Sequence, residues 1–220
     1  MNPVGAAEIR RLLDVVATRI IESRDLLTDL DRTIGDGDHG VNMARGFAAV
    51  REKLASLPEN TDVASLLKTA GMTLVSTVGG ASGPLYGTAF IYAAQELAGA
   101  GEMSPALLSR AMRAAANGVV KRGRAGVGDK TMLDTIEPVA AFLESSDSGG
   151  SSPEERMREV RRIARAGMES TVPMQARKGR ASFLGERSIG CCDPGAMSSC
   201  IMIETALDVL VRAFPELVAE

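Results

Sequence analysis

Apolar residues recur every three or four positions along most of the chain, which is the spacing of one face of an α-helix. Near the N-terminus one such series consists of Ile9, Leu12, Leu13, Val16 and Ile20. No stretch alternates apolar and polar residues in the way a half-buried β-strand does. The pattern therefore predicts an all-α protein.

Proline, glycine and capping residues divide this pattern into about eight helical segments. The segments are expected near residues 3–25, 41–56, 63–78, 84–99, 104–121, 131–144, 153–175 and 195–213. The polar stretch from Ser145 to Pro153 is predicted to be a solvated loop, because neither flank is long enough for an independent core. Residues 1–220 are accordingly expected to form a single domain, a barrel or bundle of about eight antiparallel helices.

Glycines gather in four stretches between the predicted helices, and such stretches allow unusual backbone angles or the close approach of a ligand. The stretches are Gly35–Gly40, Gly79–Gly87, Gly123–Gly128 and Gly179–Gly195. If consecutive helices run antiparallel, alternate loops fall at the same end of the bundle, and these four are the alternate loops. The sequence therefore predicts a composite ligand site at one rim.

Composition and charge narrow the possible partners. The net charge of -3 and the sequence pI of about 5.4 give no basic field that would attract nucleic acid or an anionic membrane surface. No apolar run approaches the roughly 20 residues of a membrane span. The three cysteines lack the spaced pairs of a zinc site and suit reduced thiols. We therefore expect a cytoplasmic protein that binds neither nucleic acid nor membrane and that holds any polyphosphate ligand locally.

The strongest chemical signal is the segment LDRTIGDGDHGVN, which begins at Leu30. Its carboxylates, Asp31, Asp36 and Asp38, would repel one another unless a cation lies between them, and Mg²⁺ is commonly shared between a few carboxylates and substrate phosphates. The spacing excludes an EF-hand, because neither possible register provides the required glycine and glutamate. The alternative is an Asp-rich turn with a helix N-cap. Three carboxylates together favour a metal site in an acidic loop.

Three further loops carry groups that suit a phosphate ligand. Residues 78–85 (VGGASGPL) offer backbone N–H groups and the Ser82 hydroxyl near a helix start. Residues 122–134 end with capping-box character at Thr131 and Asp134, and residues 177–195 carry basic side chains. Each loop also has an ordinary explanation, namely turn chemistry, helix capping or a solvated charge run. The chain has no GxxxxGK[ST] sequence, so none of these loops is a P-loop.

His39 is the only histidine, so a Ser-His-Asp triad or a Cys-His pair would have to use it. Its neighbours are the metal-type aspartates, which favours a ligand-contact or loop-stabilising role. No residue is an obvious covalent nucleophile. Phosphoryl transfer needs little more than positioning and charge neutralisation, so no catalytic residue is assigned.

Taken together, the motifs GDGDHGVNM, GGASGPLYGTAF, GDKTMLDTIEPV and GRASFLGERSIG, followed by DPGA, resemble the nucleotide-binding subunits of dihydroxyacetone kinases. The same unit occurs as the C-terminal kinase domain of longer, ATP-dependent kinases of that family. The resemblance covers essentially the whole chain with the motifs in family order. It implies a barrel of eight antiparallel helices with the nucleotide at one rim.

The resemblance also implies roles for single residues. Asp31, Asp36 and Asp38 are expected to coordinate two Mg²⁺ ions that bridge the phosphates of ADP or ATP. The positions expected to contact the nucleotide are His39, Gly40, Val41, Asn42, Ala81, Ser82, Gly123, Met132, Arg180, Asp193, Pro194 and Gly195.

The implied activity is that of a phosphotransferase with an alcohol group as acceptor, of the glycerone kinase type. In the family a small ketose is held by a different subunit through a covalent histidine, so this chain is expected to be active only with that partner. Some members keep ADP bound and have it rephosphorylated by a phosphotransferase-system phosphocarrier fed from phosphoenolpyruvate, and the length of a separate subunit favours this scheme.

Other functions are also compatible with the sequence. The family often has a histidine where Cys191-Cys192 precede Asp193, and often has threonine at Met197, which suits an ATP-dependent kinase subunit for a four-carbon ketose such as erythrulose. A second alternative is a nucleotide-sensing coregulator that binds a transcription regulator. A third is an acidic helical scaffold without a ligand.

Overall fold

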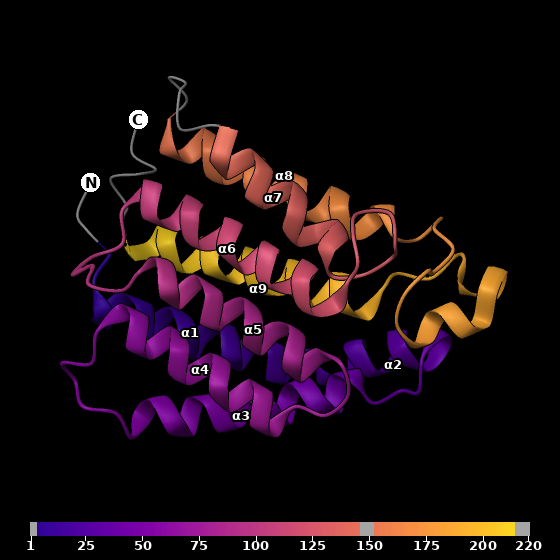
Figure 1. The fold of residues 1–220 in the computed structure, drawn as a ribbon, viewed down its shortest axis with the longest axis horizontal. Helices are drawn as coiled ribbons and strands as arrows, with labels where there is room; N and C mark the ends of the chain where they lie inside the picture. Colours follow the sequence, from indigo (N-terminus) through magenta and orange to yellow (C-terminus); the bar gives the residue numbers. More distant parts are fainter. Residues whose placement is uncertain (1–3, 146–151, 214–220) are drawn as a thin grey trace.

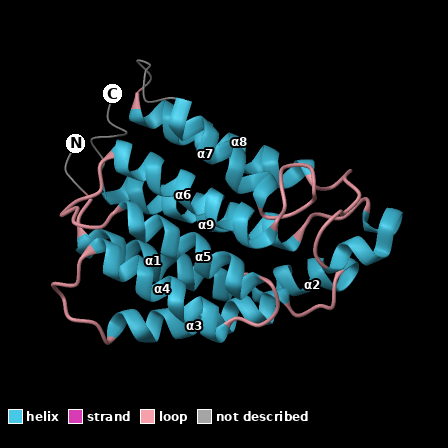
Figure 2. Ribbon diagram, viewed as in Figure 1, coloured by secondary structure: helices cyan, strands magenta, loops and turns pink. Residues whose placement is uncertain are grey.

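The computed structural model describes residues 4–145 and 152–213, and every regular element in these ranges is a helix (Figure 2). The α-helices are α1 (Ala6–Glu22), α2 (Arg24–Ile34), α3 (His39–Ala55), α4 (Val63–Thr77), α5 (Ser82–Glu96), α6 (Pro105–Gly123), α7 (Leu133–Ser145), α8 (Pro153–Ser170) and α9 (Pro194–Ala213). A 3₁₀-helix, η2 (Arg180–Ser188), lies between α8 and α9.

All of these α-helices except α2 pack side by side in a closed ring. Contacts run from α1 to α3 and on in order through α4, α5, α6, α7 and α8 to α9, which returns to α1. Successive helices of the ring run in opposite directions (Figure 1). The predicted antiparallel helical barrel is therefore confirmed. α2 continues beyond α1 at one end of the ring, where it contacts α3, α9 and η2.

The interior of the ring is filled by aliphatic side chains and very few aromatic ones. Its largest fully buried members include Leu13, Ile20, Phe47, Leu66 and Leu74. Most of them repeat at the three- and four-residue spacing visible in the sequence. The apolar periodicity therefore identified the helix faces that form this core.

Glycines allow α4 and α5 to cross in backbone contact. A Cβ atom added at Gly71 would lie 2.7 Å from the carbonyl oxygen of Gly87, and one added at Gly87 would lie 2.6 Å from that of Gly71. Real Cβ atoms do not approach oxygen so closely, so only glycine fits at either position. This crossing brings the ends of the two helices together at the loop 78–81.

The N-terminal part of the chain differs from the prediction. The segment expected near 3–25 is α1, which ends at Glu22, and Ser23 caps it by donating its hydroxyl to the Arg19 carbonyl at 2.8 Å. The chain then continues as α2, where the sequence pattern predicts mainly a loop. Residue 3 lies outside the described residues.

The other boundaries agree within a few residues, except that α8 ends at Ser170, five residues before the expected position. The start of α5 at Ser82, two residues before Pro84, is within this agreement. The 3₁₀-helix η2 was not expected. Of the predicted solvated loop, residues 146–151 lie outside the described part of the chain.

By length and composition alone, α9 passes a test for a membrane-spanning helix. The window Pro194–Val211 has a mean hydropathy of 1.3, and 44% of it is buried. The core helices of soluble proteins pass the same test. Here α9 contacts α1, α7 and α8, so its apolar face is used to close the ring.

Candidate functional site

The loops that follow α2, α4, α6 and α8 lie at the same end of the barrel, on the right in Figure 1. They surround a cavity of about 480 Å³, which is within the range of small-ligand sites. Each of the four loops contributes lining residues. The prediction that these four loops meet at one rim of the barrel is therefore confirmed.

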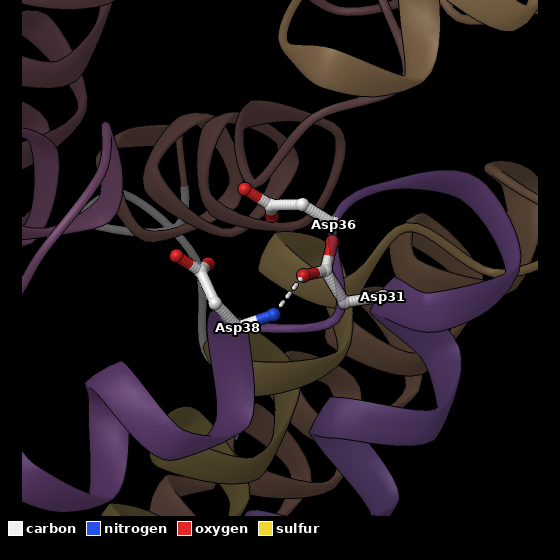
Figure 3. Close-up of side chains that lie close together, drawn as sticks. All are labelled: Asp31, Asp36 and Asp38. Atoms are coloured by element: carbon white, nitrogen blue, oxygen red, sulfur yellow. Dashed lines mark hydrogen bonds between the residues drawn. The ribbon is translucent and has the colours of Figure 1, made fainter.

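Three aspartates form one wall of this cavity. One carboxylate oxygen of each of Asp31, Asp36 and Asp38 lies within 4.8 Å of the others, and the three side chains face one another in Figure 3. Asp36 and Asp38 belong to the connection before α3. The sequence predicts Asp31 in the acidic loop, but the residue lies in the last turn of α2. The helix therefore fixes the position of the Asp31 carboxylate under the loop that follows.

Two glycines let the chain fold closely over Asp31. A Cβ atom at Gly35 would lie 2.0 Å from Asp31 Oδ1, and Gly37 has a positive φ of 74°. The loop then returns so that Asp31 Oδ2 accepts the backbone N–H group of Asp38 at 2.8 Å (Figure 3). The same oxygen accepts the N–H of His39 at 3.1 Å. The Asp-Gly pattern therefore places three carboxylates together, as its composition suggested.

The electrostatics of this cluster suit a cation. Burial raises the pKa of Asp38, and the charges of Asp36 and Asp31 raise it further, while a hydrogen bond from Asn42 acts in the opposite direction. Asp36 Oδ2 lies 2.7 Å from Nε of Arg180, whose guanidinium supplies one positive charge. Converging carboxylate oxygens with uncompensated charge are the donors that Mg²⁺ prefers. The residues present therefore fit this metal.

His39 belongs to a buried polar network beside the aspartates. Its Nδ1 lies 3.0 Å from Ser82 Oγ, and its Nε2 lies 3.0 Å from Ser198 Oγ. Burial lowers the pKa of His39 to about 4, although the charge of Asp31 acts to raise it, so the ring is neutral at pH 7. Tyr86 extends the network, since its hydroxyl lies 2.7 Å from Ser198 Oγ. The histidine thus links α3, α5 and α9.

Most of the residues proposed from the sequence line the cavity. They are the three aspartates together with His39, Ala81, Ser82, Gly123, Met132, Arg180, Asp193, Pro194 and Gly195. Gly40, Val41 and Asn42 are not among the lining residues. Gly40 packs against α2, where a Cβ atom would meet the Arg24 carbonyl oxygen at 2.0 Å. Val41 is 46% exposed, and Asn42 accepts a hydrogen bond from Arg45 at 2.7 Å.

Several lining residues were not selected from the sequence. Arg122 and Lys178 place two more cations at the cavity, and within the described ranges neither has a carboxylate at ion-pair distance. Tyr86 and Lys130 also line it, and both are almost fully buried. The motifs containing Tyr86 and Lys130 are visible in the sequence, but the direction of their side chains is a property of the folded chain.

The cavity can therefore bind an anion together with a metal. Carboxylates occupy one wall, the loop 78–81 and the N-terminus of α5 form another part of the lining, and cationic side chains lie at the rim. A helix N-terminus favours a bound anion. Carboxylates alone would repel a phosphate, whereas a divalent cation between them and the phosphate removes that repulsion.

Comparisons with known proteins agree with this chemistry. The DAK2 domain family matches residues 33–208. The ADP-binding subunit of a PEP-dependent dihydroxyacetone kinase from Escherichia coli K12 is 49% identical over 180 residues, which are 82% of this chain and 85% of that subunit. A corresponding subunit from Listeria innocua is 41% identical over 201 residues, 91% of this chain and 95% of that subunit.

Solved structures share the fold. The native dihydroxyacetone kinase of C. freundii superposes with a TM-score of 0.72 at 23% identity, and the same kinase in complex with AMP-PNP and Mg²⁺ with a TM-score of 0.68 at 25% identity. Each match covers 94% of this chain but 35% of the larger kinase, so the chain spans about a third of that protein. Because the family match extends over most of its length, the chain belongs to the DAK2 domain family.

Proposed function

We propose that this chain is the nucleotide-binding subunit of a dihydroxyacetone kinase-type complex, which transfers a phosphoryl group to a small ketose held by a partner subunit. The observation that carries the proposal is the convergence of a three-aspartate cluster, a glycine-rich helix start and cationic side chains on one cavity. The DAK2 family membership and the names of the relatives support the same function.

In this proposal Asp31, Asp36 and Asp38 hold two Mg²⁺ ions. When bound, Mg²⁺ neutralises phosphate charge and polarises the phosphoryl oxygens. The backbone N–H groups of the loop 78–81 and the Ser82 hydroxyl position the phosphates, and Arg180 adds a charged donor. His39 stays neutral and keeps Ser82 in place through its hydrogen bond. The protein then contributes positioning and charge stabilisation rather than a covalent intermediate.

The partner is part of the proposal. The only histidine of the chain is buried, and both its ring nitrogens already contact serine hydroxyls, so it is not available to hold a ketose carbonyl. The ketose therefore arrives on another protein. The donor we propose is ATP that forms on the protein when a phosphoenolpyruvate-fed phosphocarrier rephosphorylates bound ADP, because one relative is named PEP-dependent and another, from Lactococcus lactis, PTS-dependent.

The alternative acceptor, a four-carbon ketose, has weaker support. The D-erythrulose kinase of Mycolicibacterium smegmatis is 32% identical, and the match covers only 35% of that enzyme. Binding to a transcription regulator stays a prediction. A single domain for residues 1–220 and a cytoplasmic location, with three free thiols, complete the proposal.

The decisive experiment removes carboxylate charge from the metal cluster. We expect Asp36→Asn and Asp38→Asn to abolish Mg²⁺-dependent retention of ADP, because each substitution removes an anionic metal ligand. Mass spectrometry of the nucleotide released from freshly purified protein measures retention, and circular dichroism checks the fold. Asp29→Asn, on the exposed side of α2, is the matched control and should keep its nucleotide. Full ADP retention in both site variants would refute the metal assignment.

A second experiment tests the need for the partner. We expect the purified chain alone to leave dihydroxyacetone and erythrulose unphosphorylated, and activity to appear when a dihydroxyacetone-binding subunit and the phosphocarrier are added. Phosphorylation of either ketose by the isolated chain would contradict the split-enzyme proposal and would require a ketose site within this barrel.

A further inference from the structure

Lys130 is a fully buried lysine in the loop between α6 and α7, with 1% of its surface exposed. A buried ammonium group is unfavourable unless hydrogen bonds replace its hydration. Here Nζ donates to the backbone carbonyl oxygens of Thr171 at 2.6 Å and Cys191 at 2.5 Å. The lysine therefore ties its own loop to both ends of the long segment that connects α8 to α9.

The backbone at Lys130 is also unusual. Its φ of 61° lies in the left-handed region, which residues other than glycine rarely adopt. Such strained conformations persist only where surrounding contacts enforce them, and they cluster at ligand sites. Asp134 supplies such contacts, because its carboxylate accepts the N–H groups of Gly128 at 2.6 Å and Thr131 at 2.7 Å, on either side of Lys130. The loop is thus built to turn this one side chain inward.

The hydrogen bonds of Lys130 converge on the turn that begins α9. The hydroxyl of Thr171 accepts the N–H of Asp193 at 3.0 Å, so Thr171 connects Lys130 to this turn from one side while Cys191 connects it from the other. Asp193 accepts the N–H of Ala196 at 2.8 Å at the start of the helix. The turn from Asp193 to Gly195 lines the cavity.

The charge of Lys130 acts on the same turn. Asp193 is buried, and burial raises its pKa to about 7, whereas the nearby ammonium of Lys130 acts to lower it. Loss of the lysine would therefore remove two hydrogen bonds and a positive charge that favours the ionised form of Asp193.

We propose that Lys130 is a positioning residue for nucleotide binding, which fixes the Asp193–Gly195 turn in the cavity wall while its own ammonium stays bonded to two backbone carbonyls. The inference rests on the nucleotide-binding function proposed above. The aspartates that would hold Mg²⁺ lie on α2 and before α3, and Lys130 bonds to none of them, although the segment that it connects carries Arg180, which pairs with Asp36. Lys130 therefore affects nucleotide affinity more than metal affinity.

The test compares Lys130→Met, which keeps the length of the side chain but not its charge, with Lys130→Arg. Lys121→Met, at the exposed end of α6, is the matched control. Three measurements are made: ADP binding with Mg²⁺ by titration calorimetry, Mn²⁺ binding without nucleotide by electron paramagnetic resonance, and amide hydrogen exchange of residues 189–197.

We expect Lys130→Met to weaken ADP binding by about tenfold or more. Exchange at Asp193 should accelerate, and Mn²⁺ affinity should change much less than ADP affinity. Lys130→Arg should restore part of the ADP affinity.

Four results would overturn the inference: unchanged exchange at Asp193, faster exchange with unchanged ADP affinity, parallel loss of ADP and Mn²⁺ affinity, or no recovery in a folded Lys130→Arg protein. If Lys130→Met does not fold, Thr171→Val replaces it, because it removes the hydroxyl that accepts the Asp193 N–H and should weaken ADP binding in the same selective way. Wild-type protein that binds no ADP would reject the proposed function, whereas hydrogen exchange would still decide whether Lys130 fixes the turn.

Discussion

Asp193 shows how a residue in the site can work against the stability of the fold. Its carboxylate has a pKa of about 7 in the folded protein because it is buried, against about 3.9 in an unfolded chain. The folded state therefore binds a proton more tightly than the unfolded state between these two pH values. Stability contributed by this group is present at low pH and is lost as pH rises toward 7.

Asp193→Asn should remove this pH dependence. Between pH 5.5 and pH 8 we expect the free energy of unfolding of the variant to gain about 2 kcal/mol relative to the wild type, from about 1.4 kcal/mol for each pH unit up to 7. The asparagine oxygen can still accept the N–H of Ala196. Urea unfolding at both pH values, with EDTA present, measures the difference. An equal difference at the two pH values would show that Asp193 does not titrate in this range, and Asp29→Asn serves as the exposed control.

Among single residues, the sequence predicted those whose partners lie close by in the chain. The spacing of Asp31, Asp36 and Asp38 was enough to predict that their carboxylates lie together, and the metal that they would hold stays a prediction. The roles of Lys130 and Tyr86 were missed, since both depend on burial against segments far away in the chain. A lysine in the GDKT motif looks solvated until the fold closes over it.

At the scale of helices, the crossing of α4 and α5 depends on two glycines that allow backbone contact. We expect Gly87→Ala to destabilise the protein by about 1–3 kcal/mol, because the added Cβ would overlap the Gly71 carbonyl oxygen and the Val75 side chain. Urea unfolding measures the change. Gly101→Ala is the matched control, since no atom lies within 4 Å of its added Cβ, and it should change stability by less than about 0.5 kcal/mol. Equal effects at both positions would argue against a tight crossing.

The helices α2 and η2 are not predicted by the sequence pattern, and the reason can be given for each. The buried residues of α2 include Leu27, Asp31 and Ile34, which follow a helical spacing, but the Asp-Gly run after them suggested that Asp31 also lay in a loop. η2 is interrupted by Gly185, with a φ of 57°, so it has no sustained period to detect. Periodicity identifies the buried face of a helix but not the helix that packs against it. Antiparallel alternation therefore predicted only that the four loops share one rim, and the eight-helix barrel was implied by the family resemblance.

For the whole molecule, charge distribution explains how an acidic protein can bind a polyphosphate. The net charge is -3, yet the cationic side chains of Arg122, Lys178 and Arg180 are all at the cavity. The three aspartates that would hold a metal form one of its walls. Because a Debye length of about 8 Å limits the range of the overall field, these local charges dominate at the site. The ligand is therefore recognised where segments from four parts of the chain meet.

Binding of ADP and Mg²⁺ at this cavity should stabilise the entire fold, because an unfolded chain cannot bring the four loops together. At a free ADP concentration about 100 times the Kd with Mg²⁺ present, the expected gain is about 2.7 kcal/mol. For a chain of this length that corresponds to a rise in Tm of roughly 5–10 °C. Differential scanning fluorimetry should show the rise with ADP and Mg²⁺ together, and EDTA should reverse it. The Asp36→Asn protein, tested in parallel, should show almost no rise. A shift of the same size without a divalent cation would mean that the nucleotide binds independently of the aspartate cluster, and the proposed coupling between metal and nucleotide would then be wrong.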